Sequence, residues 1–287
     1  IVRDVVAIPN GWTSETDHLA FDLTFGILIA AVVLAVVLGN IQRVGKVTSR
    51  LVPGMVLFYL ALVAWVLVDN AFAIPGAFAL ILDDAFSGQS VAGGAVGTVI
   101  LMGVRRGAFS NEAGIGTESM AHGAAKTNEP IREGLVAMLG PVIDTLIVCT
   151  CTALAILATG VWQGSEADRV SLTARAFEYA LPGTGAYLLT VMVLFLSLST
   201  IFSFWYYGSK CLGFLIGAER QHHYIWIYTG LVVLGAVGSL DMVISLIDGM
   251  YGLMALPTMT SALLLAPRVK AATAVYFARH PRESVAF

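Results

Sequence analysis

Three apolar stretches of the chain carry residues that could bind an ion or a small solute. Asp144 lies about ten residues into an apolar run that begins at Gly134, where a carboxylate is costly and suggests a function. A second run carries several hydroxyl side chains, among them Ser199 and Thr200, and hydroxyl oxygens suit a hard monovalent cation. Phe204 lies one turn beyond Thr200 on the same helix face. The competing interpretations are structural, because Asp144 could simply be hydrogen-bonded and helical Ser and Thr commonly bond the preceding turn.

The third stretch is rich in glycine, with Gly93, Gly94 and Gly97 close together and Thr98 after them. Glycine in a membrane helix permits either close packing of a neighbour or local unwinding. An unwound segment at membrane depth survives only around a protein-enclosed cavity, where its carbonyls can bind a cation. If the helix breaks here, we expect Gly97 and Thr98 to contact the substrate and Gly93 and Gly94 to act as a hinge.

A dense polar block follows, which reads Gly-Val-Arg-Arg-Gly-Ala-Phe-Ser-Asn-Glu-Ala-Gly-Ile-Gly-Thr over residues 103–117. Ser110 or Asn111 could cap a following helix, with Glu112 in its first turn. If the chain breaks here instead, Phe109, Ser110 and Asn111 are the substrate-contacting candidates. The paired arginines suggest a cytoplasmic position, where the block would be a hinge or inner gate. The residues assigned to that gate are Arg106, Gly107, Glu112, Gly114 and Gly116.

Composition defines the class of protein that must position these residues. Of 287 residues, 57% are hydrophobic and only 12% are charged, against roughly 25% in an average soluble domain. The mean hydropathy is +0.83. A soluble surface cannot be built from so few charges, and the same shortage excludes disorder and nucleic-acid binding. The composition predicts an all-α polytopic membrane protein.

Seven apolar runs approach the length of about 17–25 residues that a bilayer crossing needs. They cover residues 21–39, 52–68, 91–104, 134–159, 185–208, 224–238 and 241–266. Thirteen of the 16 basic residues fall in alternate loops, so the positive-inside rule predicts seven crossings that start outside and end in the cytoplasm. The seventh run contains Pro257 and is preferred as one long or broken span. Two short surface helices are expected on the outer side, at residues 74–86 and 171–180.

The polar block resembles the fingerprint of the sodium:alanine (or glycine) symporter family, the alanine/glycine–cation symporters. That fingerprint reads Gly-x-x-Arg-Gly-x-Phe-Ser-Asn-Glu-Ala-Gly-x-Gly, and residues 103–116 match it. The similarity continues at residues 143–145, 149–153 and 252–257. The chain departs from the family at Glu118-Ser119-Met120, where small apolar residues are usual, and at Phe204, where Trp is usual.

The resemblance implies a leucine-transporter-like inverted-repeat fold, of which the seven runs would be helices four to ten. The glycine-rich run would be the broken sixth helix. In such a fold the eighth helix contributes hydroxyls to a sodium site, which makes Ser199 and Thr200 the sodium candidates. The same helix lines the substrate pocket, which assigns substrate contacts to Thr200 and Phe204.

The implied function is import of a small neutral amino acid, alanine or glycine, coupled to sodium by alternating access in the inner (plasma) membrane. Sodium is then the coupling ion, no other cofactor is expected, and the chain is not expected to be an enzyme. Residues 1–20 would form an extracytoplasmic segment, 21–266 the transporter domain and 267–287 a basic cytoplasmic tail. The expected partners are the substrate, sodium, the bilayer and missing N-terminal helices of the same protein. The alternative is an incomplete, non-transporting fragment of such a symporter.

Overall fold

The computed structural model describes residues 1–86, 103–104, 107, 110–112, 114–163 and 169–280, and every regular element within these ranges is a helix. Five helical segments are long and apolar enough to cross a membrane. They are Leu19–Val37, Gln42–Asp69, Pro130–Thr159, Gly185–Ile216 and Leu240–Arg279. The described residues are therefore all-helical, which is consistent with a polytopic class, and five of the predicted runs form helices long and apolar enough to cross a membrane.

The remaining two predicted spans have different outcomes. Residues 91–102 of the third run lie outside the described residues. The sixth run folds as helix α12 (Tyr224–Val237), whose 14 residues are fewer than the roughly 20 that a full crossing needs. A prediction of seven crossings therefore stays a prediction.

Helix α13 (Leu240–Arg279) is one continuous element of 40 residues that includes Pro257 and Pro267. A proline inside a helix removes one backbone hydrogen bond and commonly bends the helix without ending it in a membrane. The seventh run is thus a single helix that continues beyond residue 266, into the stretch predicted as a tail.

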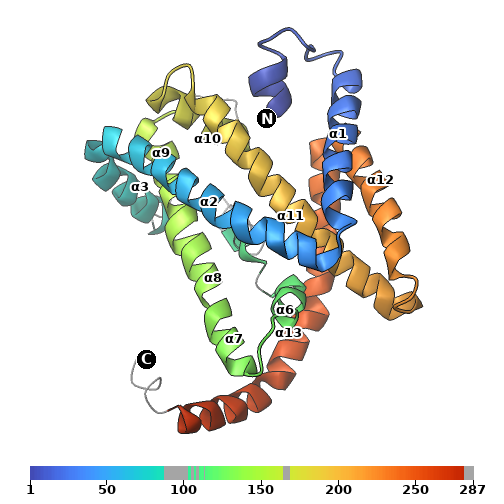
Figure 1. The fold of residues 1–287 in the computed structure, drawn as a ribbon. Coiled ribbons are helices and arrows are strands. Elements are labelled where there is room, and N and C mark those ends of the chain that lie inside the picture. Colours follow the sequence, from blue (N-terminus) through green and yellow to red (C-terminus); the bar gives the residue numbers. More distant parts are fainter. Residues whose placement is uncertain (87–102, 105–106, 108–109, 113, 164–168, 281–287) are drawn as a thin grey trace. The chain divides into compact units, whose positions relative to one another are not determined.

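The chain forms two compact units. The first unit joins residues Ile1–Ser87 to Thr150–Val243. In it, α1 (Leu19–Val37) lies alongside α12, and Gly26 permits this approach because a Cβ there would stand 2.7 Å from the Cβ of Ala236 (Figure 1). The other elements of this unit are η1 (Arg3–Ala7), α2 (Asn40–Asp69), η2 (Ala71–Ala73), α3 (Ile74–Phe86), α9 (Thr150–Thr159), α10 (Arg169–Ala180), α11 (Gly185–Ile216) and η4 (Gln221–His223).

Two buried clusters stabilise the first unit. One joins α2, α9, α10 and α11 around Phe177, Val63 and Leu189. The second joins α1, α2, α11 and α12 around Val33, Phe202 and other apolar side chains. The short helices α3 and α10 coincide with the two predicted surface helices, so those predictions of helix are confirmed.

The second unit joins Gly88–Cys149 to Ile244–Phe287. Its described elements are α6 (Thr117–Gly123), α7 (Pro130–Ala137), α8 (Leu139–Pro141), the π-helix η3 (Val142–Cys149) and most of α13. α7, α8, η3 and α9 follow one another directly and make up the fourth predicted span. π-helical turns inside α-helices are rare and occur often at functional sites.

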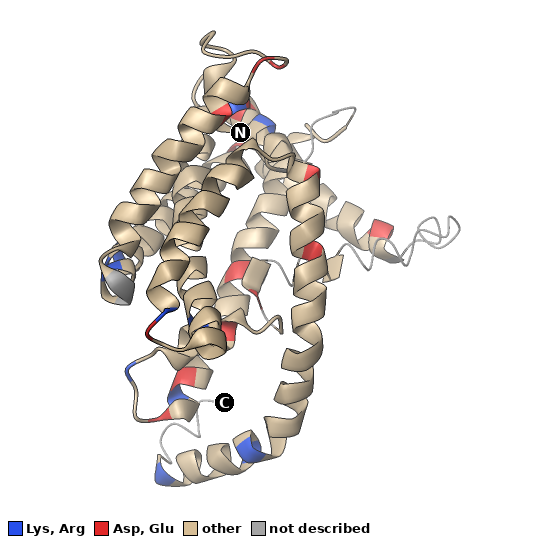
Figure 2. Ribbon diagram, turned by 90° about the vertical axis from the view of Figure 1, so that its right-hand side faces the viewer, with Lys and Arg blue, Asp and Glu red and all other residues tan. Residues whose placement is uncertain are grey.

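The spans present apolar side chains to their surroundings, as a membrane requires. Leu57 is 69% exposed, and Leu263 is 76% exposed. Figure 2 shows the helices uncharged over most of their length, because each span carries few ionisable residues. An apolar exterior of this kind is stable in lipid and would aggregate in water.

Candidate functional site

The fingerprint forms a tight turn in the second unit, built on left-handed backbone. Glu112, Gly114 and Gly116 have φ values of 57°, 85° and 102°. The Glu118 carboxylate accepts hydrogen bonds from the backbone N–H groups of Gly114 (3.2 Å) and Gly116 (2.9 Å). Left-handed conformations are accessible to glycine at little cost, which explains the glycines at two of the three positions.

This turn overturns one expectation of the sequence analysis. Ser110 and Asn111 do not cap the following helix, because α6 begins only at Thr117, with Gly116 as its N-cap and no side-chain cap. The physical reason is the left-handed turn, which delays the helix by several residues. Glu112 consequently lies before the helix and not in its first turn.

Ser110 and Asn111 instead contact η3, which carries the intramembrane carboxylate. The Ser110 hydroxyl donates a hydrogen bond to Oδ2 of Asp144 and lies 3.4 Å from Sγ of Cys149. The Asn111 amide donates to the Thr145 hydroxyl at 3.1 Å. Two consecutive side chains of the fingerprint thus bind two consecutive side chains of the π-helix.

The other side of the turn contacts α13. Thr258 donates a hydrogen bond to the Gly114 carbonyl at 2.7 Å. A Cβ on Gly116 would stand 2.3 Å from Cγ2 of Thr258, and one on Gly114 would stand 3.0 Å from Sδ of Met259. Only residues without side chains fit so close to α13, directly after its Pro257. The turn therefore bridges η3 and α13.

Glu112, at the start of this turn, lies outside the five candidate spans. Burial raises the pKa of the Glu112 carboxyl, and the charge of the nearby Glu118 raises that pKa further. The charged form of Glu112 is therefore disfavoured in the folded chain.

Of the other predicted gate and substrate residues of the third run and the polar block, the structure describes Gly107 and leaves six undescribed. Gly107 is helical and half-buried, with open space around its Cα. Six further candidates lie outside the described residues: Gly93, Gly94, Gly97, Thr98, Arg106 and Phe109. Their assignments stay predictions.

The predicted sodium ligands lie on α11, in the first unit. Ser199 is buried and donates to the Leu196 carbonyl at 2.8 Å, while the exposed Thr200 donates to the same carbonyl at 3.1 Å. Phe204 is half-buried and packs edge-on against Tyr207, with ring centroids 5.5 Å apart. The hydroxyls thus make the local bonds that helical Ser and Thr usually make.

A cavity of about 890 Å³ lies between α1, α11 and α12 of the same unit. Its α11 wall includes Ser197 and Ile201, whereas Ser199, Thr200 and Phe204 are not among its lining residues. The predicted sodium ligands therefore lie on a different part of α11 from the cavity wall.

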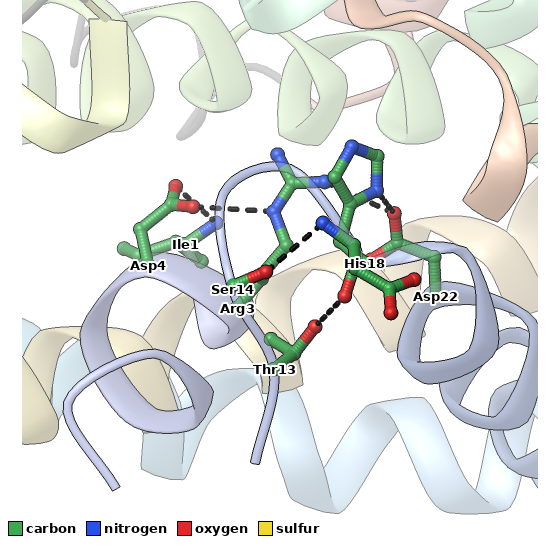
Figure 3. Close-up of polar contacts among 8 residues, drawn as sticks. Ile1, Arg3, Asp4, Thr13, Ser14, His18 and Asp22 are labelled. Atoms are coloured by element: carbon green, nitrogen blue, oxygen red, sulfur yellow. Dashed lines mark hydrogen bonds and ion pairs between the residues drawn. The ribbon is translucent and has the colours of Figure 1, made fainter. Parts of the chain in front are cut away.

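An ionic cluster that the sequence analysis missed lies at the rim of this cavity. Figure 3 shows Arg3 and His18 converging on Asp22, with Nη1 of Arg3 at 3.0 Å and Nδ1 of His18 at 2.7 Å from Oδ2. Asp22 lies in the first turn of α1 and is largely buried. The spacing of His18 and Asp22 at i and i+4 was the available signal.

The second unit thus brings together the polar fingerprint, a carboxylate within a span and a proline-containing helix. With the apolar spans, these features define a multi-pass membrane protein that carries polar groups inside its helical region. The chain belongs to the Sodium:alanine symporter family, whose sequence model matches residues 7–286.

Individual relatives agree with that membership. The chain is 37% identical to the sodium/alanine symporter AgcS of Methanococcus maripaludis, over 88% of this chain and 56% of that protein. It is 37% identical to the uncharacterized transporter YflA of Bacillus subtilis, over 88% of this chain and 55% of the relative. The chain is 30% identical to the probable sodium/glutamine symporter GlnT of the same bacterium, over 89% of this chain and 55% of that protein. The chain spans about half the length of these relatives, whose names are those of transporters and not of enzymes.

Proposed function

We propose that the chain belongs to a secondary active transporter that imports a small neutral amino acid together with sodium. The observation that carries this proposal is the family match, which extends over nearly the whole chain. The proposed location is the inner (plasma) membrane. The mechanism is alternating access in a leucine-transporter-like inverted-repeat fold, with these segments as its fourth to tenth helices.

In this proposal the fingerprint turn is the inner gate. It is joined to η3 through Ser110 and Asn111 and to α13 through Gly114. Because interfaces held by few directional bonds can exchange between two arrangements, such a bridge suits an element that opens and closes. The other proposed hinge or gate residues are Arg106, Gly107, Gly93 and Gly94.

Sodium is assigned to the hydroxyls of Ser199 and Thr200. Each hydroxyl donates its hydrogen to the Leu196 carbonyl, and this leaves the oxygen lone pairs as acceptors for a cation. The local bonds therefore orient these oxygens without using their coordinating capacity. No other cofactor is proposed, and the coupling is the mutual stabilisation of ion and substrate sites.

Alanine or glycine is the proposed substrate, with Phe204 and Thr200 as contacts on α11. Gly97, Thr98, Phe109, Ser110 and Asn111 are the proposed contacts from the broken helix. Relatives are named for alanine and for glutamine, whose side chains differ in size and in polarity.

The test is uptake of radiolabelled alanine by the purified protein in liposomes, with an inward sodium gradient. We expect accumulation that disappears when the gradient is dissipated and that excess glycine inhibits more strongly than excess glutamine. Equal uptake with and without the gradient would contradict sodium coupling.

The alternative is an incomplete, non-transporting fragment of such a symporter. Equilibrium binding of labelled alanine in detergent, with sodium or with choline, separates the two. Sodium-dependent binding without uptake supports the alternative, whereas uptake excludes it.

A further inference from the structure

A second, smaller pocket of about 430 Å³ lies where α1 ends, α11 nears its C-terminus and α12 begins. It combines basic and aromatic side chains, and we refer to it as the basic pocket. Its lining includes Lys210, His222, Trp205, Tyr206, Trp226 and Leu38. Every lining residue belongs to the first unit.

Close packing of the α11–η4–α12 hairpin shapes this pocket. A Cβ on Gly208 would stand 2.1 Å from Oη of Tyr224, and one on Gly213 would stand 3.1 Å from Oε1 of Gln221. Gly217, with φ 97°, ends α11 and turns the chain back. The two helices are therefore held close together, and the orientation of Lys210 and His222 follows from a packed scaffold.

The pocket presents hydrogen-bond donors. The Lys210 ammonium lies 5.5 Å from the Tyr206 ring centroid, and no salt bridge joins it to a carboxylate in the described part of the chain. His222 donates from Nδ1 to the Glu219 carbonyl at 2.7 Å, which leaves Nε2 as its second polar atom. The Trp205 indole is 8% exposed, and its buried Nε1–H has no hydrogen-bond partner among the described residues.

The position of the pocket points to a lipid. The positive-inside rule predicts that the C-terminal end of α11, with Lys210, and the loop after it, with Arg220, lie on the cytoplasmic side. Trp226 is 62% exposed and Leu38 is 58% exposed, so apolar and amphipathic side chains flank the basic groups. Trp is typical of the membrane–water interface, and basic pockets between spans on the cytoplasmic side bind anionic headgroups.

We propose that the basic pocket binds the phosphate headgroup of an anionic phospholipid, with Lys210 as its cationic contact and Trp226 at headgroup level. An acyl chain would then lie against the apolar surface of α1 and α12. A zwitterionic lipid fits less well, because its ammonium would approach Lys210. This inference does not depend on which solute the protein transports.

Native mass spectrometry of the purified chain in detergent tests the proposal, with phosphatidylglycerol and phosphatidylethanolamine added at equal concentrations. We expect preferential retention of phosphatidylglycerol. Lys210→Gln should weaken that retention about fivefold, the effect of one basic side chain near an anionic surface, and Lys210→Arg should preserve it. Lys46→Gln is the matched control, because Lys46 is an exposed lysine of α2 that does not line the pocket, and it should change retention less than twofold.

Three outcomes would overturn the proposal. Equal retention of both lipids would show that the site does not select for charge. Equal losses of phosphatidylglycerol retention in Lys210→Gln and Lys46→Gln would show that the lipid does not bind in this pocket. Displacement of phosphatidylglycerol by millimolar glycerol phosphate would show that the site binds a soluble phosphate and not a membrane lipid. The Lys210→Arg variant separates a loss of binding from a loss of folding.

Discussion

The fingerprint turn of the second unit and the middle of α11 in the first both hold groups of polar atoms, but they hold them differently. Ser110 bonds a residue 34 positions away, and Gly114 bonds one 144 positions away. Within the described residues, the hydroxyls of Ser199 and Thr200 bond the preceding turn of their own helix. The comparison teaches that the turn depends on tertiary contacts for its shape, whereas α11 positions its hydroxyls by secondary structure alone.

The largest effect is expected from a substitution that disrupts the fingerprint turn. Gly116→Ala places a Cβ at φ 102° and 2.3 Å from Cγ2 of Thr258. We expect a loss of about 3 kcal/mol in the free energy of unfolding, from backbone strain and overpacking together. Urea unfolding in detergent, followed by circular dichroism, measures this loss.

Gly134→Ala is the matched control, since Gly134 is a helical glycine of α7 with open space around it. The control should stabilise the protein slightly, because alanine is the better helix former. Equal stability of the two variants would show that the turn relaxes without cost.

The next largest effect is expected when a substitution removes the carboxylate that the turn contacts. Asp144→Ala leaves the Ser110 hydroxyl without its acceptor on η3, so we expect alanine uptake to fall at least about tenfold. Asp144→Asn keeps an acceptor oxygen and should lose less. Asp83→Asn, at an exposed acid of α3, should leave uptake unchanged. Full uptake by Asp144→Ala would remove Asp144 from the functional site.

A smaller effect is expected from a substitution on α11, where the hydroxyls make local bonds and not tertiary ones. Thr200→Val removes a hydroxyl whose bond is local, so we expect the stability to change little and the sodium concentration for half-maximal uptake to rise about tenfold. Thr190→Val is the control, because Thr190 makes the same kind of bond, to the Ala186 carbonyl at 2.7 Å, nearer the start of α11. An unchanged sodium dependence in Thr200→Val would refute the ion-site assignment.

The smallest effect concerns Glu112 and the dependence of stability on pH. Because its pKa is raised in the folded chain, Glu112 lowers stability as the pH rises from its unfolded pKa through its folded pKa. Glu112→Gln should therefore raise the thermal midpoint by a few degrees at pH 8. The two proteins should converge well below the unfolded pKa, where the carboxyl is protonated in both states. A difference that is the same at both pH values would point to a cause other than ionisation.

Much of the fold follows from patterns along the sequence. The apolar runs predict the five long helices because burial in lipid is decided by local composition over about 20 residues. The two short surface helices, expected at residues 74–86 and 171–180, follow instead from amphipathic patterns, and the second is observed from residue 169. The position of Asp144 within an apolar run also singles it out without knowledge of its partner.

The contacts of the candidate site could not be predicted, because they join distant segments. Ser110 and Asn111 have the residue types of helix caps. The left-handed turn after them keeps them from capping α6, and their side chains bond η3 instead. Thr258 and Glu118 gain their importance from Gly114 and Gly116, and no local pattern pairs Thr258 with a residue 144 positions away. Arg3 and Asp22 are a second long-range pair that periodicity does not reveal.

The most direct test of the proposed inner gate asks whether the fingerprint turn moves when sodium and alanine are added. Ser110→Cys is introduced after Cys149, Cys151 and Cys211 are replaced by Ala, and a membrane-impermeant maleimide is applied to the cytoplasmic side. The account predicts that labelling of position 110 is slowed when sodium and alanine are present together, and not when choline replaces sodium. A labelling rate that is the same under all of these conditions would contradict the role of the turn as an inner gate.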